Sequence, residues 1–260
     1  MKKVGIIGYG RIGSYLHKKI ESTPGLSVSF IYDIAEGKTA GLPSSMLAKN
    51  FESLAERSAD LVVEAADFRA VGALAPQIVK RTDMLILSAS ALADETLATS
   101  LQSICEETGH KFHIPHGALL GMDGFQDARA TFDEISITTI KAPRNLDFTF
   151  QDRWKLEDIK ERVVLHDGST RGVCKLFPRN VNAHAVLAIS GLGFDQTRSV
   201  LIADPNATVA SHHILAKGGG TTTEIMQSSP IKGVTGDFTL ASVSGTIARV
   251  LLQKNGLNVV

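Results

Sequence analysis

The sequence has few cysteines, no net charge and no long apolar run. Its two cysteines, Cys105 and Cys174, exclude a disulfide framework, and their spacing matches no zinc site. The 27 Lys and Arg residues balance the 27 Asp and Glu residues, so charge gives no reason to expect nucleic acid or an anionic membrane as a partner. No run approaches the roughly 18 apolar residues of a membrane span, and the first apolar run stops at Gly8, unlike a signal peptide. We therefore expect a cytoplasmic protein.

The first part of the sequence alternates short apolar runs with segments of helical spacing. Four runs are rich in apolar and β-forming residues: 4–8, 26–32, 60–66 and 83–88. Runs that are apolar on both faces suit strands inside a parallel sheet, and their alternation with helices predicts βαβ units. We therefore expect an α/β fold over residues 1–115, a Rossmann-type doubly wound parallel sheet.

The sequence pattern changes after Pro115. Glu134–Ile140 alternates apolar and polar residues, which predicts a strand with one solvated face. Further expected elements are a helix opening at Gly117–Asp123, a helix at Val181–Ser190, strands at Ser199–Ala203 and His212–Ala216, a hairpin turn at Gly218–Thr223, and a last helix at Phe238–Gln253. We expect a smaller α+β substrate domain with an open mixed sheet over residues 116–237, and a C-terminal helix, 238–260, that packs back on the first domain. A second copy could cover the open sheet, so a homodimer is expected.

A G-x-G-x-x-G pattern follows the first expected strand and opens the first expected helix. Gly8 permits the tight turn, Gly10 lets a diphosphate approach the backbone, and Gly13 lets helix and strand pack closely. The helix N-terminus at Arg11 and Ile12 offers N–H groups to phosphates. The pattern therefore predicts a dinucleotide site, with a glycine turn that only packs as the alternative.

Small and acidic residues stand at the ends of the next expected strands. Asp33 ends the second strand, where a carboxylate accepts hydrogen bonds from ribose hydroxyls and repels a 2′-phosphate. NAD is thus the expected cofactor, and Lys38 leaves NADP open. Ala65, Ala66 and Ser88 end two further strands, where small side chains let a cofactor lie close, although simple helix packing explains them equally well.

Several segments resemble the L-aspartate dehydrogenase family, short NAD(P)-dependent enzymes linked to NAD biosynthesis. The resemblance spans nearly the whole chain, and the glycine turn and Asp33 contribute little to it because many dehydrogenases share them. More particular are five segments: Ser88–Asp94, Pro115–Asp123, Thr138–Pro143, Phe177–Asn182 and Ala203–Pro205, the last followed by His212 and Ile214.

The resemblance implies roles for residues of the second domain. By that match, Ala118 and Asn182 contact the cofactor and His212 is the active-site histidine. Five residues depart from the family's usual pattern: His116, Ile140, Ala142, Ala210 and His184. They fall close to the expected substrate pocket, so they leave the identity of the substrate open more than the fold or the cofactor.

Amino-acid oxidation requires a group that titrates near neutrality, and histidine is the usual choice. His212 follows Asp204-Pro205 in the domain that must supply the substrate side, and the resemblance favours it over a surface or core histidine. His213 points to the opposite strand face and is expected to be a bystander. A metal site at His110, His113 and His116 is not expected, because an extended run splits these side chains between two faces. His116 is instead expected to line the cleft.

A dicarboxylate substrate requires cationic or amide donors. Candidates in the second domain are Lys141, Arg144, Arg179, Asn180 and Asn182. Lys141 ends an expected strand and matches the family motif, with a solvated lysine as the alternative. Asn180 and Asn182 begin an expected helix, where an ordinary N-cap is the alternative.

These features favour oxidation of L-aspartate with NAD(P)⁺, giving iminoaspartate and then oxaloacetate and ammonia, or the reverse reductive amination. His212 is the expected acid/base, with Lys141, Asn180 and His116 as expected substrate ligands. One alternative is a dehydrogenase or reductase for another small amino or hydroxy acid. Another is a dinucleotide-binding regulator without catalytic activity.

Overall fold

The chain folds into two compact units in a computed structural model. The structure describes residues 1–50, 53, 57–230 and 236–252. One unit comprises Met1–Pro115 together with the segment that starts at Leu240, and the other comprises His116–Thr239. None of the helices in the described ranges is long and apolar enough to cross a membrane.

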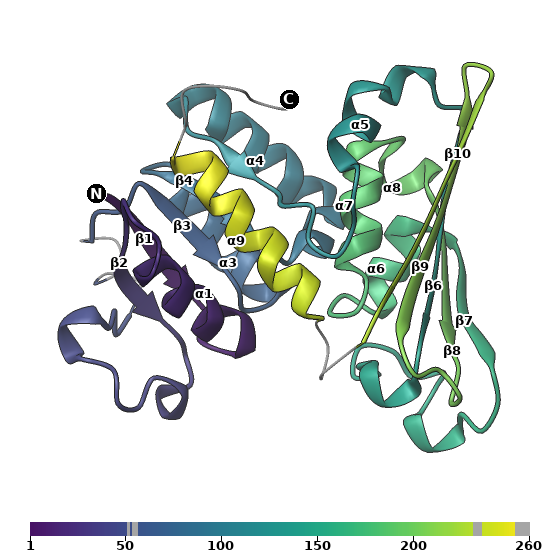
Figure 1. The fold of residues 1–260 in the computed structure, drawn as a ribbon, viewed down its shortest axis with the longest axis horizontal. Helices are drawn as coiled ribbons and strands as arrows, with labels where there is room; N and C mark the ends of the chain where they lie inside the picture. Colours follow the sequence, from purple (N-terminus) through teal and green to yellow (C-terminus); the bar gives the residue numbers. More distant parts are fainter. Residues whose placement is uncertain (51–52, 54–56, 231–235, 253–260) are drawn as a thin grey trace. The chain divides into compact units, whose positions relative to one another are not determined.

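The first unit is built on a five-stranded parallel sheet of order β2-β1-β3-β4-β5 (Figure 1). Its strands are β1 (Lys2–Ile7), β2 (Leu26–Tyr32), β3 (Leu61–Glu64), β4 (Asp83–Ile86) and β5 (Phe112–His113). All four strand pairs are parallel. Every residue of β3 is buried, as expected for a strand with helices on both faces of the sheet.

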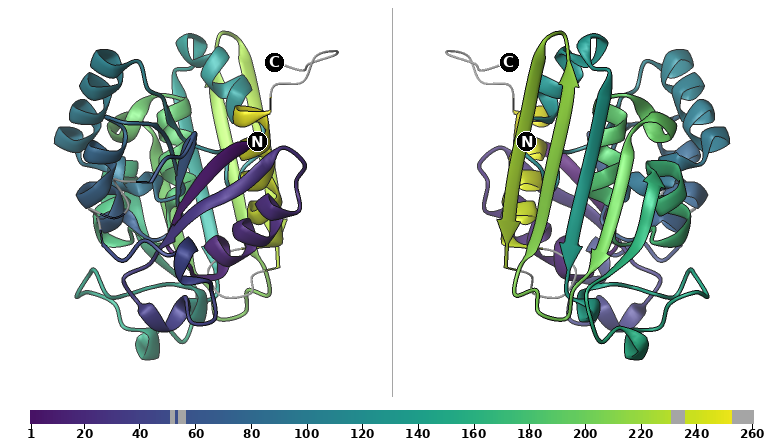
Figure 2. Two further views of the ribbon diagram at one scale, coloured as in Figure 1. Left: turned by 90° about the vertical axis from the view of Figure 1, so that its left-hand side faces the viewer. Right: turned by 90° about the vertical axis from the view of Figure 1, so that its right-hand side faces the viewer.

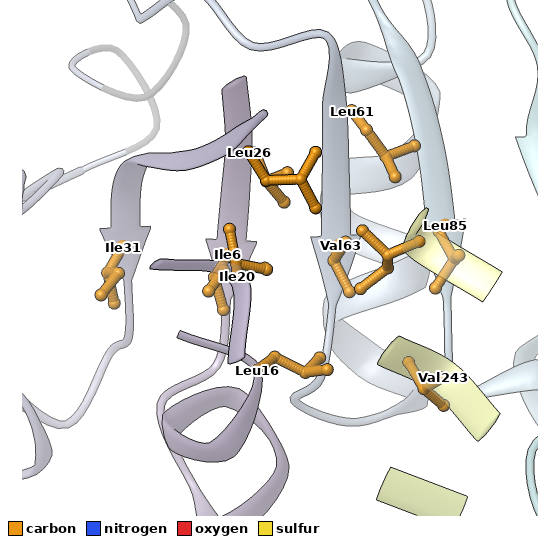
Figure 3. Packing of buried hydrophobic residues seen from close by; sticks show 11 residues of the cluster. Ile6, Leu16, Ile20, Leu26, Ile31, Leu61, Val63, Leu85 and Val243 are labelled. Carbon is orange, nitrogen blue, oxygen red and sulfur yellow. The ribbon is translucent and has the colours of Figure 1, made fainter. Parts of the chain in front are cut away.

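Helices cover both faces of this sheet (Figure 1). They are α1 (Arg11–Glu21), α3 (Phe68–Ile78), α4 (Glu95–Thr108) and α9 (Asp237–Leu251). Helices α1 and α9 share one hydrophobic cluster, in which Leu16 and Ile20 of α1 pack with Val243 and Ile247 of α9 and with the buried side chains of the strands (Figure 3). Burial of this apolar surface is the main term that stabilises the unit.

The second unit holds a mixed sheet of order β10-β9-β6-β8-β7. Its strands are β6 (Glu134–Lys141), β7 (Val163–Ser169), β8 (Arg198–Ala203), β9 (Ala210–Gly218) and β10 (Thr221–Ser229). Its helices are α5 (Met122–Asp127), α6 (Thr170–Leu176), α7 (Asn182–Ser190) and α8 (Gly193–Gln196). Strand β6 is parallel to β8 and antiparallel to β9. The two sheets together confirm the predicted fold class.

Only one face of the second sheet is covered within this unit. Burial alternates along β6 and β9, so that every second side chain is buried. No described helix of the unit lies on the other face, which is seen directly in the right-hand view of Figure 2. Residues such as Met226, which is 76% exposed, lie on that open face. Successive side chains of β6 and β9 therefore point alternately to the covered face and to the open face of the sheet.

Short 3₁₀ turns occupy several connections. They are η1 (Glu36–Lys38), η2 (Ser44–Met46), η3 (Ala89–Ala93), η4 (Arg129–Thr131), η5 (Pro143–Asn145) and η6 (Leu156–Asp158).

The structure differs from the sequence-based expectation at several places. Helix α9 ends at Leu251, and residues 253–260 of the predicted C-terminal helix lie outside the described residues. Helix α5 begins at Met122, because Gly117 and Gly121 adopt positive φ angles that belong to turns. Thr221–Thr223 lie in β10, so the hairpin turn is confined to the preceding glycines. Strand β7 was not predicted, because polar residues of an edge strand hide the alternating pattern. Helices α6 and α8 were not predicted either.

Candidate active site

The glycine turn between β1 and α1 is formed by close backbone contacts. Gly8 has a φ of +90°, and a Cβ atom there would lie 2.7 Å from the backbone of Ala65 and Ala66. A Cβ on Gly13 would lie 1.9 Å from the carbonyl oxygen of Gly8, so any side chain would push α1 away from the turn. In contrast, a Cβ on Gly10 would meet no atom within 4 Å, which leaves open space above the backbone at this position.

The N-terminus of α1 has the features of an anion site. Gly10 is its N-cap, no side chain caps the helix, and its first turn contains no acidic residue. The helix therefore begins with Arg11 and Ile12 beside the open backbone of Gly10. A diphosphate fits this arrangement, because the partial positive charge of the helix end stabilises an anion.

Asp33 ties the end of β2 to the glycine turn. Its carboxylate accepts hydrogen bonds from the backbone N–H of Tyr9 at 2.6 Å and of Ala35 at 2.8 Å. The ammonium group of Lys38 lies 3.6 Å from the same carboxylate. Lone pairs remain on Asp33 for further donors such as ribose hydroxyls, and Lys38 is a cation beside this carboxylate. These contacts fit either nucleotide, and the contact of Asp33 with the cofactor stays a prediction.

Glu64, at the end of β3, is a buried carboxylate that the sequence analysis did not single out. Its oxygens accept hydrogen bonds from the N–H groups of Ala66, Leu87 and Ser88 at 2.7, 3.2 and 3.0 Å and from the Ser88 hydroxyl at 2.9 Å. Burial, partly offset by these hydrogen bonds, raises the pKa of Glu64 to about 7. Glu64 thus joins the ends of β3 and β4. The predicted residues Ala65, Ala66 and Ser88 lie at this shared edge, where ligands of parallel sheets bind.

The second unit gathers polar side chains on the covered face of its sheet. Thr139 of β6 is paired in register with His212 of β9, and the Thr139 hydroxyl lies 2.8 Å from Nδ1 of His212. Lys141 follows two residues later on the same face of β6. All three are buried, with exposed fractions of 0%, 9% and 6% for Thr139, His212 and Lys141. Nδ1 of His212 is engaged by Thr139, so Nε2 is the ring nitrogen that this contact leaves open.

Lys141 is a buried cation with a backbone partner. Its Nζ donates a hydrogen bond to the carbonyl oxygen of Asn180 at 3.1 Å. Burial alone lowers the pKa of its ammonium group to about 8, and among the described residues no carboxylate pairs with it. Burial, followed by the charge of Lys141, lowers the pKa of His212 to about 3. A buried ammonium without a counter-ion is a ready partner for an anionic ligand.

Asn180 is tied to its neighbours by its side chain as well. Its amide oxygen accepts from the backbone N–H of Asp147 at 2.9 Å, and its amide nitrogen donates to the carbonyl oxygen of Asn145 at 3.3 Å. These bonds fix the loop before α7 and with it the carbonyl oxygen that holds Lys141. Direct contact of Asn180 with a substrate stays a prediction.

The remaining predicted site residues of the second unit lie around the start of α7 and the turn before α5. Asn182 is the first residue of α7, and His116 lies at the start of that turn. The carbonyl oxygen of Ala118 accepts a hydrogen bond from Gln227 Nε2 at 2.6 Å, which ties the turn to β10. His213, the expected bystander, lies on the open face and pairs with Glu224.

No group of His, Cys, Asp or Glu residues within the described ranges could hold a metal ion. His110 and His113 instead flank Asp83, at 3.4 and 3.6 Å from its carboxylate oxygens.

The first unit has a parallel sheet and a glycine turn that opens a helix, and the second unit has a mixed sheet with a buried lysine and histidine. Together these features define the class of two-domain NAD(P)-binding dehydrogenases. In agreement, residues 8–115 match the family model described as the NAD-binding domain of homoserine dehydrogenase. Residues 123–250 match the model described as the C-terminal domain of aspartate dehydrogenase.

The chain belongs to the L-aspartate dehydrogenase family. It is 32% identical to an L-aspartate dehydrogenase of Nitrosopumilus maritimus over 88% of this chain and 89% of the relative. It is 34% identical to that of Methanococcoides burtonii over 84% of both chains. The crystal structure of an aspartate dehydrogenase from Thermotoga maritima has the same fold, with a TM-score of 0.77, 24% identity and full coverage of both chains. The resemblance noted in the sequence is thereby confirmed.

Proposed function

We propose that this protein oxidises L-aspartate with NAD⁺ or NADP⁺. The observation that carries the proposal is the buried pair of Lys141 and His212 on one face of the second sheet, in a chain of this family. L-Aspartate loses the hydrogen on its α-carbon as a hydride and one proton from its amine, which gives iminoaspartate. Water then adds to the imine, and oxaloacetate and ammonia are released.

The first unit supplies the nucleotide site in this proposal. The open backbone at Gly10 and the N-terminus of α1 hold the diphosphate, and Asp33 accepts hydrogen bonds from the ribose. The strand ends that Glu64 joins line the remainder of the site. The bound nucleotide supplies the hydride acceptor. All other steps fall to the residues of the second unit.

Lys141 binds a carboxylate of the substrate. Its ammonium is held by the Asn180 carbonyl, so that little side-chain entropy remains to be lost when a ligand binds. A substrate carboxylate replaces the missing counter-ion and gains a charge-assisted hydrogen bond. Aspartate has two carboxylates. We propose that the predicted candidates Asn180 and His116 bind the second one.

His212 moves the protons. In the free protein its imidazole is neutral, because burial and the charge of Lys141 lower its pKa to about 3. A bound dicarboxylate offsets the charge of Lys141, the smaller of the two causes, and therefore raises the pKa of His212 above its value in the free protein. His212 then accepts a proton from the substrate amine and releases it to solvent. After hydride transfer it accepts a second proton, from the water that attacks the imine, and gives this proton to the departing nitrogen, which leaves as ammonia.

The proposal is tested with a substrate panel: L-aspartate, D-aspartate, L-asparagine, L-alanine, L-glutamate and L-malate, each with NAD⁺ and with NADP⁺. We expect reduced nicotinamide to form from L-aspartate with a kcat/KM more than about 100-fold above that of L-alanine, which lacks the second carboxylate. The absorbance of the reduced nicotinamide gives the rate, and oxaloacetate and ammonia are quantified separately.

Each alternative has its own outcome in the same panel. A preference for L-malate or another amino acid would replace L-aspartate as the substrate. Nucleotide binding without turnover of any member of the panel would support a regulator instead of an enzyme.

We also propose that the protein acts as a homodimer in the cytoplasm. The open face of the second sheet, on which Met226 is exposed, is proposed as the surface that a second copy covers. Cys105 and Cys174 are both free, which suits a reducing compartment.

A further inference from the structure

A second histidine lies behind His212 in the second unit. Nε2 of His184, on α7, lies 2.7 Å from the same Thr139 hydroxyl that lies 2.8 Å from Nδ1 of His212. His184 and Thr139 are both completely buried. The three side chains come from α7, β6 and β9, so the hydroxyl bridges two imidazoles from different elements.

The Thr139 hydroxyl has a single proton, and this limits which nitrogen of each imidazole ring carries a proton. The hydroxyl has one proton, so it donates to one imidazole nitrogen and accepts an N–H from the other. If neither ring donated, a lone pair would face a lone pair at hydrogen-bond distance. If both donated, the hydroxyl proton would be buried without an acceptor, which is unfavourable.

Two proton arrangements remain. In the first, His212 donates from Nδ1 to Thr139, Thr139 donates to Nε2 of His184, and each ring carries its proton on Nδ1. In the second, His184 donates from Nε2 to Thr139, Thr139 donates to Nδ1 of His212, and each ring carries its proton on Nε2. The two rings therefore share one tautomer, and only the first arrangement leaves a basic lone pair on Nε2 of His212.

Nδ1 of His184 is the far end of this chain of hydrogen bonds. It is a buried nitrogen without a hydrogen-bond partner. In the first arrangement it carries a buried proton that lacks an acceptor, which is unfavourable, and in the second it carries a lone pair. The environment of this atom, which lies beyond any contact with a substrate at His212, thus influences which arrangement is more stable.

We propose that His184 is a positioning residue for His212, which through the Thr139 hydroxyl sets the ring nitrogen on which His212 carries its proton. The proposal rests on the role of His212 in the proposed function, and it concerns a residue that departs from the family's usual pattern. This role requires that the imidazole rings of His184 and His212 are both neutral. Burial is the main cause that holds the pKa of His184 well below its usual value, with further contributions from the charged forms of His212, Lys141 and His166.

The first test requires no substrate. Proton–nitrogen correlation spectra of the full chain with ¹⁵N-labelled histidine distinguish the two neutral tautomers of each ring, and His184→Leu and His212→Asn assign the signals. At pH 7.5 we expect His184 and His212 to show the same tautomer, and Thr139→Val to remove this match or shift both signals. Different tautomers on the two rings of the unsubstituted protein would overturn the proposal.

The second test is a double-mutant cycle on L-aspartate turnover. His184→Leu and Thr139→Val are each expected to lower kcat by about tenfold, a part of the 10²- to 10⁴-fold that acid–base catalysis contributes, with KM little changed. Because both act through one bridge, the double variant is expected to lose no more than either single variant. Thr139→Ser keeps the hydroxyl and is expected to restore kcat.

The outcomes separate this proposal from the proposed function. If the two losses in kcat multiply in the double variant, or if Thr139→Val and Thr139→Ser have equal kcat values, the proposal is wrong and His184 only packs against its neighbours. Matched tautomers in a protein that does not turn over L-aspartate would refute the proposed substrate and leave the link between the rings intact.

Discussion

Replacement of His212 by asparagine is expected to lower kcat/KM for L-aspartate by about 10²- to 10⁴-fold, the range that general acid–base catalysis contributes. Asparagine keeps an amide near the Thr139 hydroxyl but cannot accept the amine proton. Binding of the nucleotide is expected to stay unchanged, because the groups proposed to hold its diphosphate and ribose, at Gly10 and Asp33, lie in the other unit. Steady-state kinetics and titration calorimetry with NAD⁺ and NADP⁺ measure the two effects separately.

The neighbouring histidine provides the matched control. His213 lies on the open face of the sheet, where it pairs with Glu224, so His213→Asn is expected to keep nearly full activity. Equal activity of His212→Asn and the unsubstituted protein would remove His212 from the chemistry. A similar loss in both variants would point to damage to the sheet instead.

Replacement of Lys141 by methionine is expected to raise KM for L-aspartate by more than about tenfold, because the buried ammonium is lost as a partner for a carboxylate. The same change is expected to stabilise the free protein. Burial lowers the pKa of this lysine to about 8, so keeping it charged at pH 7 costs on the order of 1–3 kcal/mol, which methionine avoids.

The pH dependence of this stabilisation has a defined sign. The folded-state pKa lies below the unfolded-state value, so the unfolded chain binds more protons between about pH 8 and 10.5 and the free energy of unfolding rises across that window. The stability gain of Lys141→Met is therefore largest at pH 7 and shrinks as the pH rises. Denaturant unfolding at pH 7 and pH 10 measures it, with Lys38→Met as an exposed control. A destabilised variant with an unchanged KM would contradict both parts.

The first unit could be predicted from the sequence to a large extent. Its strands are apolar on both faces and its helices are amphipathic, so local pattern and final structure agree for β1, α1 and β2. The glycine turn was predicted for the same reason, because its requirements are local: a positive φ at Gly8 and no room for a side chain at Gly13.

The polar connections of the site could not be predicted in the same way. Glu64 stands as one acid in an apolar run, and Thr139 as one hydroxyl on the buried face of a strand, but their partners Ser88 and His212 are distant in sequence. Only strand pairing and register bring such residues together. The helix that carries His184 was predicted from the sequence, whereas the position of this side chain behind Thr139 was not.

Transfer of deuterium from L-aspartate labelled on its α-carbon tests the proposed reaction most directly. The unsubstituted protein is incubated with the labelled substrate and NAD⁺ or NADP⁺, and the reduced nucleotide is examined by mass spectrometry and proton NMR. We predict reduced nucleotide that carries one deuterium on the nicotinamide ring. Reduced nucleotide without deuterium, or no reduction of either nucleotide, would contradict the proposal that this protein oxidises L-aspartate by hydride transfer.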